Sequence, residues 1–224
     1  MSASSQLPSK ETSDEELPRR LSQAIHGELP GRAAQALMEP GAAYGRHFGV
    51  PTFDVRPAAV LVLLYRRGGA WRVVLTERHA DLATHAGQIS LPGGLIEAGE
   101  TVRQAAEREL WEETGVAAEG LTPLGALSPI NLFSTHFFVQ PCVAYCGDYV
   151  TEFHPNPQEV ASLLEPTLDE LANPANQGRH LHTVPGLTYE VPHFSVGSRK
   201  VWGATAMILS EFLAVWRDAS NVKR

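Results

Sequence analysis

The sequence predicts an α/β protein, an α/β/α sandwich in which helices cover a mixed β-sheet. Short apolar runs that are typical of strands, of which residues 58–65 are the strongest, recur on both sides of an amphipathic helical segment at 101–115. A second segment with helical spacing, residues 201–215, follows the last of these runs. The 224 residues are enough for one domain of about 150–170 residues with additions.

The first 50 residues are expected to form an extension before the main domain. The opening segment, MSASSQLPSKETSDEE, is small, polar and charged, and this composition is typical of disorder. Two short helices are predicted after it, one from Leu17, Leu21 and Ile25 at fourfold spacing and one from GRAAQALM at 31–38. The main domain is expected at residues 51–217, and residues 218–224 form a C-terminal tail.

The main domain is expected to open with a β-hairpin. Residues 58–65 predict a buried strand, RRGG at 66–69 predicts the turn, and residues 71–76 predict the partner strand. Further strands are expected at 121–127, 135–144 and 187–191, and a helical turn is expected at 168–171, after Pro155, Pro157 and Pro166. The final helix, 201–215, has apolar side chains at helical spacing: Trp202, Ala206, Leu209 and Leu213.

The segment GLIEAGETVRQAAERELWEETGV, residues 94–116, has clear signals for both ends of a helix. Gly93 and Gly94 allow a tight turn after the strand-like run that ends at Leu91. Thr101 suits the N-cap, with Gln104 three residues later as a capping box requires. Gly115 provides the C-terminal stop. The prediction is a helix of about three turns.

Four carboxylates on or beside this helix predict a metal site. Glu109 and Glu113 are four residues apart, so their Cβ atoms lie about 5–6 Å apart; Glu112 lies next to them and Glu100 comes from the entry loop. Like charges this close raise one another's pKa unless a cation lies among them. Oxygen ligands favour Mg²⁺ or Mn²⁺, and the absence of Cys and His from the cluster argues against zinc. The alternative, a solvated acidic face paired with Arg108, does not explain the flanking glycines or the loop glutamate.

The spacing of these residues resembles the Nudix box, a sequence signature of Nudix hydrolases. The matching positions are Gly94, Glu100, Arg108, Glu109, Glu112, Glu113 and Gly115, with aliphatic Leu110 and Val116 between them. The resemblance implies the Nudix fold and hydrolysis of a nucleoside diphosphate linked to another group, by attack of water on one phosphorus. In such a reaction, positioning and charge neutralisation provide most of the rate.

The resemblance also implies roles for single residues. Glu109 and Glu113 would be the principal metal ligands, and Glu112 would bind a further metal or receive the proton from water. Glu100 and the backbone carbonyl of Gly93 would add ligands, while Arg108 would hold the glutamates by charge-assisted hydrogen bonds. In some branches of the family the general base follows the box, and Glu159 in HPNPQEV is the candidate here, with an exposed loop acid as the alternative.

The segment before the box, LTERHADLATHAGQISLPGG at 75–94, resembles the signature of the coenzyme A pyrophosphatase branch. The matches are Leu75, Thr76, Arg78, Leu82, His85, Gly87, Gln88, Pro92, Gly93 and Gly94, and RPAAVLVLLY at 56–65 resembles the branch's opening strand. Three positions depart from it: His79 replaces a serine, Ala83 an arginine and Leu91 a phenylalanine. The lost arginine matters because guanidinium binds phosphate bidentately.

Arg78, His85 and Gln88 are therefore the candidate substrate contacts, Arg78 for a phosphate and the other two for orientation. Each residue alone would also suit an ordinary polar loop after a strand. Three functions follow as alternatives: hydrolysis of coenzyme A or its derivatives to 3′,5′-ADP and 4′-phosphopantetheine, hydrolysis of another substrate such as ADP-ribose, a nucleotide sugar or a dinucleoside polyphosphate, or nucleotide sensing without catalysis. A sensor would be expected to have lost glutamates from the box, and none is missing here.

Composition argues against nucleic acid and membranes as partners, which leaves the small-molecule substrate that the resemblance implies. The net charge of −7 argues against nucleic acid, which selects a basic patch. No apolar run approaches the roughly 20 residues of a membrane span, and the N-terminus lacks a secretory signal, so a cytoplasmic protein is expected; the oligomeric state is left open. Cys142 and Cys146 would lie about 13 Å apart on a strand, too far for a disulfide. His180 and His182 are expected to be ordinary loop histidines.

Overall fold

A computed structural model describes residues 16–43, 46–48, 54–79, 87–147 and 152–220. The predicted disorder of the first residues therefore falls almost entirely outside the described part of the chain. Both short helices of the extension are present: α2 (Glu16–Ile25) and α3 (Gly31–Gln35), the latter continued by the 3₁₀ turn η1 (Ala36–Met38). The other short helical elements are η2 (Arg46–Phe48), η3 (Ala118–Gly120), α5 (Leu168–Ala172) and η4 (Pro174–Asn176). The structure confirms the predicted helical turn at 168–171 as α5.

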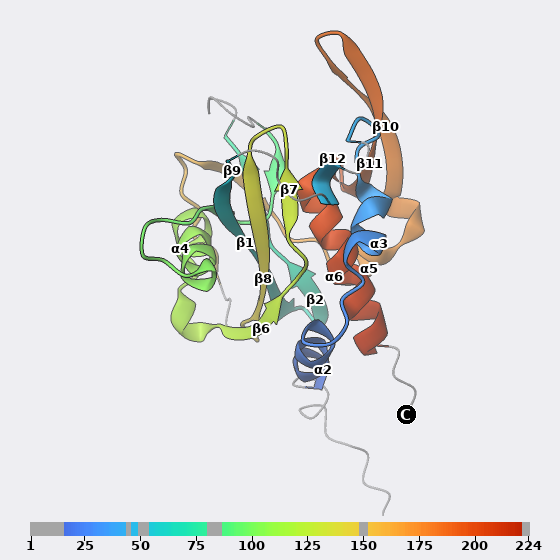
Figure 1. The fold of residues 1–224 in the computed structure, drawn as a ribbon. Coiled ribbons are helices and arrows are strands. Elements are labelled where there is room, and N and C mark those ends of the chain that lie inside the picture. Colours follow the sequence, from blue (N-terminus) through green and yellow to red (C-terminus); the bar gives the residue numbers. More distant parts are fainter. Residues whose placement is uncertain (1–15, 44–45, 49–53, 80–86, 148–151, 221–224) are drawn as a thin grey trace, which may run out of the picture.

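The main sheet has six strands and is mixed (Figure 1). Its main path runs β2 (Ala70–Val73), β1 (Arg56–Arg67), β8 (Phe137–Tyr145) and β6 (Thr122–Ala126). β5 (Gly93–Leu95) adds to β1, and β7 (Ile130–Leu132) adds to β8. The two longest strands, β1 and β8, are parallel, while the other pairs are antiparallel. The predicted mixed sheet is thus confirmed, together with its strands at 58–65, 121–127 and 135–144.

The central part of strand β1, residues 58–65, is almost entirely apolar because both of its faces are covered. Ala59, Leu61, Leu63 and Tyr65 share a core with the helix α4 (Val102–Thr114). Val62 and Leu64, which point to the opposite face, share a second core with α2 and the long helix α6 (Ala204–Ser220). Figure 1 shows α4 on one side of the sheet and α6 on the other, which is the predicted α/β/α sandwich.

The strand predicted at 71–76 is two strands. β2 pairs with β1 up to Val73, whereas β3 (Leu75–Arg78) leaves that sheet and pairs with β4 (Ile89–Ser90) and β9 (Val160–Leu164). The break lies at Val74, which is fully buried. The sequence is apolar across the break because both strands are buried there, so hydrophobicity alone does not mark it. The change of sheet directs β3 towards α4, where the candidate site lies.

A third sheet was predicted only in part. It consists of β10 (Gln177–Val184), β11 (Leu187–Val196) and β12 (Arg199–Trp202). The prediction had a single strand at 187–191, put His180 and His182 in a loop and began the last helix at 201. The two histidines lie on β10, and the helix begins only after Gly203, whose φ of 66° ends β12. The short β12 has the same apolar character as the helix that follows it, which explains the early predicted start.

Two further expectations concern membranes and thiols. Of the helices in the described residues, none has both the length and the apolar character needed to span a bilayer. Cys142 and Cys146 are both buried as free thiols, as the predicted separation required.

Glu211 of α6 joins the N-terminal extension to the domain. The side chain is fully buried, and its carboxylate accepts hydrogen bonds from Gln35 Nε2 at 2.7 Å and from the Gly31 backbone at 3.2 Å. On the domain side it accepts bonds from Ser128, through Oγ at 2.7 Å and through the backbone N–H at 3.2 Å. A buried carboxylate is tolerated when several donors satisfy it.

Substituting Glu211 by alanine is therefore expected to lower the free energy of unfolding by about 2–4 kcal/mol, because four buried donors lose their acceptor. Thermal or urea unfolding measures the loss. Glu119→Ala, at an exposed position, is the control and should change stability by less than about 0.5 kcal/mol. Equal stabilities for the two variants would show that water replaces the carboxylate at no cost.

Candidate active site

The helix α4 begins and ends as its sequence predicts. Thr101 Oγ1 accepts a hydrogen bond from Gln104 N at 3.3 Å, and the Gln104 side chain accepts one from Thr101 N at 2.9 Å, which completes the capping box. Gly115 ends the helix with φ of 75°, and its N–H donates to the Trp111 carbonyl at 2.8 Å. These two ends determine the direction in which the glutamates project.

Gly93 and Gly94 must be glycines because other atoms lie too close to their backbone to leave room for a side chain. A Cβ atom on Gly94 would lie 2.3 Å from Glu109 Oε1, and one on Gly93 would lie 2.4 Å from the Ala59 carbonyl oxygen. Strand β5 therefore lies against β1 on one side and against the Glu109 carboxylate on the other. A larger residue at 94 would displace the carboxylate. The backbone of Gly94 thus lies directly against the carboxylate cluster, while Gly93 joins the same strand to β1.

Arg108 organises three of the four carboxylates. Its Nε and Nη2 donate to the two Glu100 oxygens at 2.8 and 3.2 Å, and its Nη1 donates to Glu109 at 2.8 Å and Glu112 at 3.1 Å. Nη2 also donates to the Leu95 carbonyl at 2.9 Å. All five guanidinium N–H groups are thereby used. The hydrogen bond from Arg108 is the main reason why the pKa of Glu100 lies below its ordinary value.

Glu113 is the one box glutamate that Arg108 does not contact. Its side chain is only 3% exposed; Thr76 Oγ1 donates to Oε2 at 3.1 Å, and Arg78 Nη1 lies 4.0 Å from Oε1. The pKa of Glu113 is raised to about 8, chiefly by burial and also by the neighbouring Glu109, while the hydrogen bond from Thr76 and the charge of Arg78 oppose the rise. Burial also raises the pKa of Glu109. Two adjacent carboxylates that are costly to ionise suit a site that receives a cation.

The loop before β9 places Glu159 beside this cluster. It crosses the C-terminal end of α4, where His154 N donates to the Thr114 carbonyl at 2.8 Å and Asn156 N donates to the Glu113 carbonyl at 3.4 Å. Asn156 Nδ2 donates to Glu159 Oε1 at 3.3 Å, and His79 N donates to the Glu159 carbonyl at 2.8 Å. The charge of Glu159 makes a small contribution to the raised pKa of both Glu109 and Glu113, after burial.

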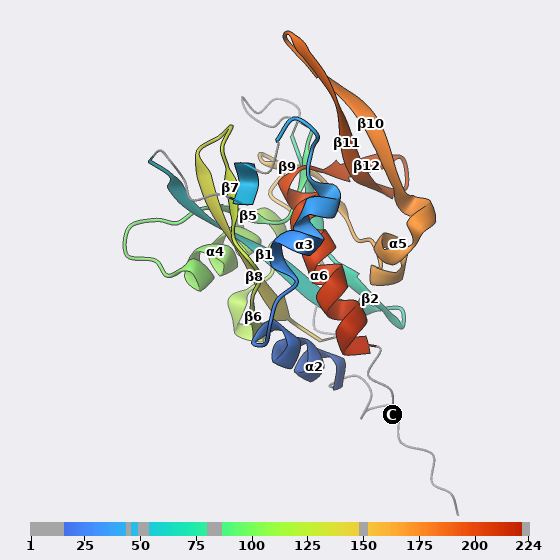
Figure 2. The same cartoon turned by 45° about the vertical axis from the view of Figure 1, so that its right-hand side comes forward.

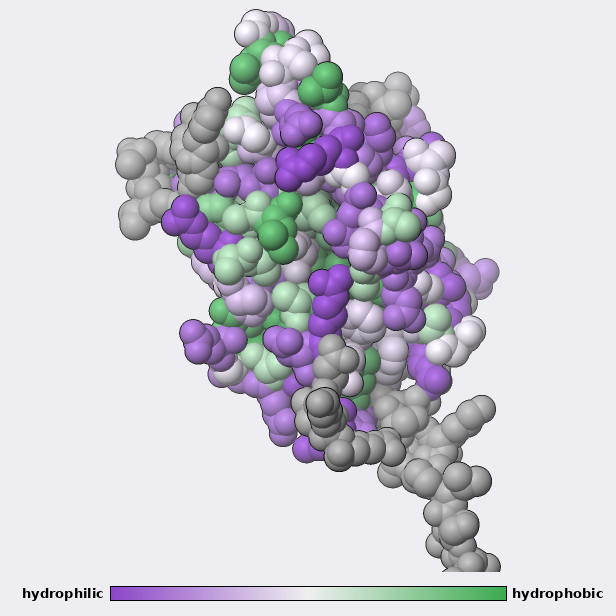
Figure 3. Space-filling view, turned by 90° about the vertical axis from the view of Figure 1, so that its right-hand side faces the viewer, coloured by the Kyte–Doolittle hydropathy of each residue, from purple (hydrophilic) through white to green (hydrophobic). Residues whose placement is uncertain are grey.

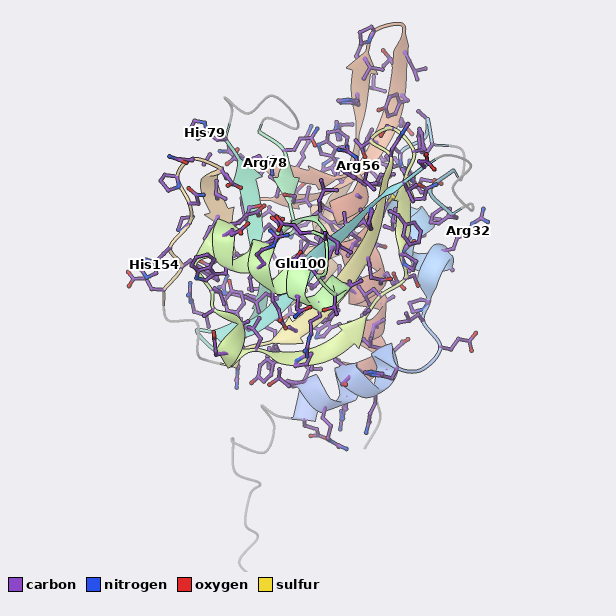
Figure 4. The ribbon with its side chains drawn as sticks, turned by 60° about the vertical axis from the view of Figure 1, so that its left-hand side comes forward. Arg32, Arg56, Arg78, His79, Glu100 and His154 are labelled. Atoms are coloured by element: carbon purple, nitrogen blue, oxygen red, sulfur yellow. The ribbon has the colours of Figure 1, made fainter. Side chains whose placement is uncertain are left out.

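The segment that resembles the coenzyme A branch reaches the same region through β3. Arg78 and Gln88 are joined by a backbone hydrogen bond of 3.0 Å, and Arg78 points towards Glu113. The Nε of Arg78 is buried and has no hydrogen-bond partner among the described residues. Figure 4 shows Arg78 and His79 at the end of β3, with Glu100 and His154 beside α4. His85, the third predicted substrate contact, lies outside the described residues.

Two residues of the site were missed by the sequence analysis. Thr76 donates a hydrogen bond to Glu113. Asn156 donates one to Glu159 through its side chain and one to the Glu113 carbonyl through its backbone, and so connects the loop before β9 to the end of α4. Thr76 was noted only as a match to the branch pattern. Thr76 and Arg78 are two residues apart, so their side chains lie on the same face of a strand. The predicted strand ended at residue 76, and this relation was therefore not used.

The donor set fits a hard divalent cation, although the side chains face Arg108. Within the described ranges, no three His, Cys, Asp or Glu side chains lie close enough together to hold a metal ion. Arg108 accounts for this, because it draws the carboxylates of Glu100, Glu109 and Glu112 towards itself. The oxygen atoms of these three and of Glu113 are the ligands that Mg²⁺ and Mn²⁺ prefer.

Comparisons with known proteins agree with this geometry. The family model of the NUDIX domain matches residues 55–185. The chain is 40% identical over 121 residues to a Pectobacterium atrosepticum protein named Uncharacterized Nudix hydrolase NudL, covering 54% of this chain and 62% of that protein. It is 30% identical over 172 residues to Nudix hydrolase 3 of Caenorhabditis elegans, covering 70% of this chain and 72% of that protein.

Solved structures show the same fold. The MutT protein from Methanosarcina mazei Go1 aligns with a TM-score of 0.50 at 19% identity, over 78% of this chain and all of that chain. A MutT/nudix family protein from Enterococcus faecalis aligns with the same TM-score at 17% identity, over 94% of this chain and 75% of that chain. Because the NUDIX domain model matches more than half of the chain, the chain belongs to the Nudix family.

Proposed function

We propose that this protein is a Mg²⁺- or Mn²⁺-dependent hydrolase that cleaves the pyrophosphate of coenzyme A or its derivatives, giving 3′,5′-ADP and 4′-phosphopantetheine or its acyl form. The proposal rests chiefly on one observation: three carboxylates gather around Arg108, and the fourth, the buried Glu113, is near Glu109 and lies 4.0 Å from Arg78. The pattern at 75–94 supports coenzyme A as the substrate class.

Glu109, Glu112 and Glu113 would hold the metal, with Glu100 and the Gly93 carbonyl as further ligands. A bound divalent cation would supply charge neutralisation for the phosphates and lower the pKa of a bound water. Arg108 orients the carboxylates and, by using every one of its donors, holds the cluster together without the metal. Arg78 would bind a substrate phosphate, and Gln88, joined to it through the backbone, would help orient the substrate.

Glu159 and Glu112 are the two candidates for the group that accepts the proton from the attacking water. Asn156 holds Glu159 by a side-chain hydrogen bond of 3.3 Å, so its carboxylate is positioned independently of Arg108. Glu112 is 40% exposed and is bound by Arg108 at 3.1 Å. A base that is not occupied by Arg108 is better able to accept a proton, which favours Glu159.

Substituting Arg78 should change the affinity for the metal and the affinity for the substrate in opposite directions. Arg78→Gln removes a cation 4.0 Å from Glu113, so the substrate-free enzyme is expected to bind Mn²⁺ several-fold more tightly. The same change removes a guanidinium–phosphate contact, and the KM for coenzyme A should rise by about tenfold. Calorimetric Mn²⁺ titration and steady-state kinetics measure the two effects. Arg103→Gln on the exposed side of α4 is the control, and weaker Mn²⁺ binding by Arg78→Gln would contradict the assignment.

A substrate panel tests the proposed activity directly. The kcat/KM for coenzyme A should exceed that for ADP-ribose, a nucleotide sugar and a dinucleoside polyphosphate, and hydrolysis should stop when a chelator removes the metal. The second candidate is a Nudix hydrolase for one of those other substrates, and Ala83, where the branch pattern has an arginine, is the observation in its favour. Coenzyme A turned over no faster than ADP-ribose would select this candidate. Metal-independent binding of coenzyme A without hydrolysis would indicate a sensor.

A further inference from the structure

The hairpin of β10 and β11 projects from the body of the protein as an arm (Figures 1 and 2). The described residues expose six large hydrophobic side chains, and three of them, Leu181, Val184 and Leu187, lie on this arm. Figure 3 shows hydrophobic surface at the same end of the molecule. Helix α4 lies on the opposite side of the molecule in both ribbon views, so the arm plays no direct part in the candidate active site.

Strand β10 is the free edge of its sheet, because the strand order is β10, β11, β12. Leu181 is paired with Glu190 of β11. In an antiparallel pair, two opposite residues turn their N–H and C=O groups either both towards each other or both away. The Glu190 carbonyl accepts a bond from Gly41 N at 2.9 Å, on the side away from β10, so Leu181 also turns its N–H and C=O outwards.

The same alternation turns the backbone groups of Arg179 and Thr183 outwards. Among the residues that the structure describes, none hydrogen-bonds to these outward groups of Arg179, Leu181 or Thr183. Six backbone donors and acceptors therefore form a row along the edge. Such a row is satisfied either by water or by another strand.

Strand β10 also lacks the features that keep sheet edges apart. Proteins protect free edges with lysine, proline, bulges or inward-pointing charges. QGRHLHTV contains neither lysine nor proline, and its register with β11 is continuous from Gln177 to Val184. Its one charged side chain, Arg179, is paired with Glu190 at 3.6 Å. The edge is thus free of bulges, weakly charged and suited to accept a strand.

We propose that two copies of this protein associate by antiparallel pairing of their β10 strands about a twofold axis at Leu181. The two three-stranded sheets then form one sheet of six strands. Leu181 packs against Leu181 of the partner subunit, and its N–H and C=O exchange hydrogen bonds across the axis. Arg179 lies opposite Thr183 of the partner subunit, so the only charge on the strand meets a neutral residue.

A second copy fits this edge better than an unrelated strand because the register is self-complementary. The Leu181-centred register brings two copies of Leu181 together, and this side chain, at 69%, is the most exposed large hydrophobic one among the described residues. The same register joins outward-facing backbone groups to outward-facing backbone groups. Centring the axis on Arg179 would satisfy the same backbone groups but place two arginines opposite each other, and like charges directly opposite destabilise a strand pair.

The oligomeric state of the full chain, measured by light scattering or sedimentation over a concentration series, tests the association. The wild type is expected to shift from monomer to dimer mass as its concentration rises, whereas Leu181→Lys should remain monomeric at every concentration. Leu37→Lys is the matched control, because Leu37 is 67% exposed but lies outside the arm, and it should dimerise as the wild type does. A wild type that stays monomeric throughout, or a Leu181→Lys variant that dimerises equally well, would overturn the proposal.

Cysteine cross-linking tests the register. In Leu181→Cys the two Cα atoms would face each other at about 5.5 Å, within the range that a disulfide spans, so mild oxidation should give a covalent dimer. In Arg179→Cys the two residues would be more than about 13 Å apart along the strands and should not cross-link. The native thiols do not interfere because both are buried. Cross-linking through residue 179 but not through residue 181 would refute the axis.

Discussion

Glu113→Gln is expected to lower turnover of the pyrophosphate substrate by about a thousandfold or more, equivalent to roughly 4 kcal/mol of transition-state stabilisation. The substitution keeps the shape of the side chain and the acceptor for Thr76, but it removes the most deeply buried charge of the carboxylate cluster. Mn²⁺ titration should show correspondingly weaker metal binding. Since a glutamine fits the same space, the fold should be retained.

The same variant should be more stable than the wild type when no metal is present. Glu113 has a folded-state pKa of about 8, against an ordinary value of 4.5. A raised carboxyl pKa stabilises the protonated folded protein, so the wild type loses stability as the pH rises from 4.5 through 8. Each pKa unit corresponds to about 1.4 kcal/mol, and each kcal/mol to about 2–4 °C of Tm in a chain of this size.

Thermal unfolding with a chelator across this pH range measures the difference. In Glu113→Gln, the part of the pH dependence of Tm that comes from residue 113 should be absent. The variant should therefore have a Tm several degrees above that of the wild type at the alkaline end of the range. Adding Mn²⁺ should stabilise the wild type more than the variant and reverse the order. Glu119→Gln at an exposed position serves as control. A variant that binds Mn²⁺ as tightly as the wild type would exclude Glu113 as a principal ligand.

The parts of the site that could be predicted are those with local signals. A capping box, a C-terminal glycine and carboxylates at fourfold spacing are all contained in one helix, and the structure shows each of them in α4. Gly94 was predicted from its place in the box, and its physical reason appears only in three dimensions. The carboxylate of Glu109 occupies the space that a Cβ atom would fill.

The parts that could not be predicted depend on contacts between distant segments. Whether residue 74 interrupts a strand depends on the partners of β2 and β3, which are β1 and β9. The contact of Thr76 with Glu113 follows from that change of sheet, as does the position of Arg78. Of the arm, part of β11 was predicted at 187–191, whereas β10 was missed for another reason. Much of β10 is exposed, and its only large apolar side chains are Leu181 and Val184, so it lacks the continuous apolar run that marks β1.

Glu159 was predicted from a local sequence signal, but its position depends on contacts between distant segments. Its substitution is the second change expected to have a large effect on activity. Its sequence context suggested a base in a loop after the box, but its distance from the box in the chain gave no position. In the structure the loop is attached to the end of α4 through His154 and Asn156, and Asn156 in turn holds the Glu159 carboxylate. A carboxylate held at the edge of the proposed metal ligands, with its own hydrogen-bond donor, is suited to receive a proton from water.

Glu159→Gln is accordingly expected to lower kcat by about 10²–10⁴-fold while leaving Mn²⁺ affinity and the KM for the substrate nearly unchanged. Glu112→Gln should instead weaken Mn²⁺ binding, because Glu112 is one of the proposed metal ligands. Glu152→Gln, an exposed acid before the same loop, controls for the loss of a negative charge. Asn156→Ala should reproduce part of the kcat loss without removing the carboxylate, whereas a purely structural role for Asn156 would change stability alone. The opposite result would identify Glu112 as the base: Glu112→Gln would lose kcat but bind Mn²⁺ normally, and Glu159→Gln would stay active.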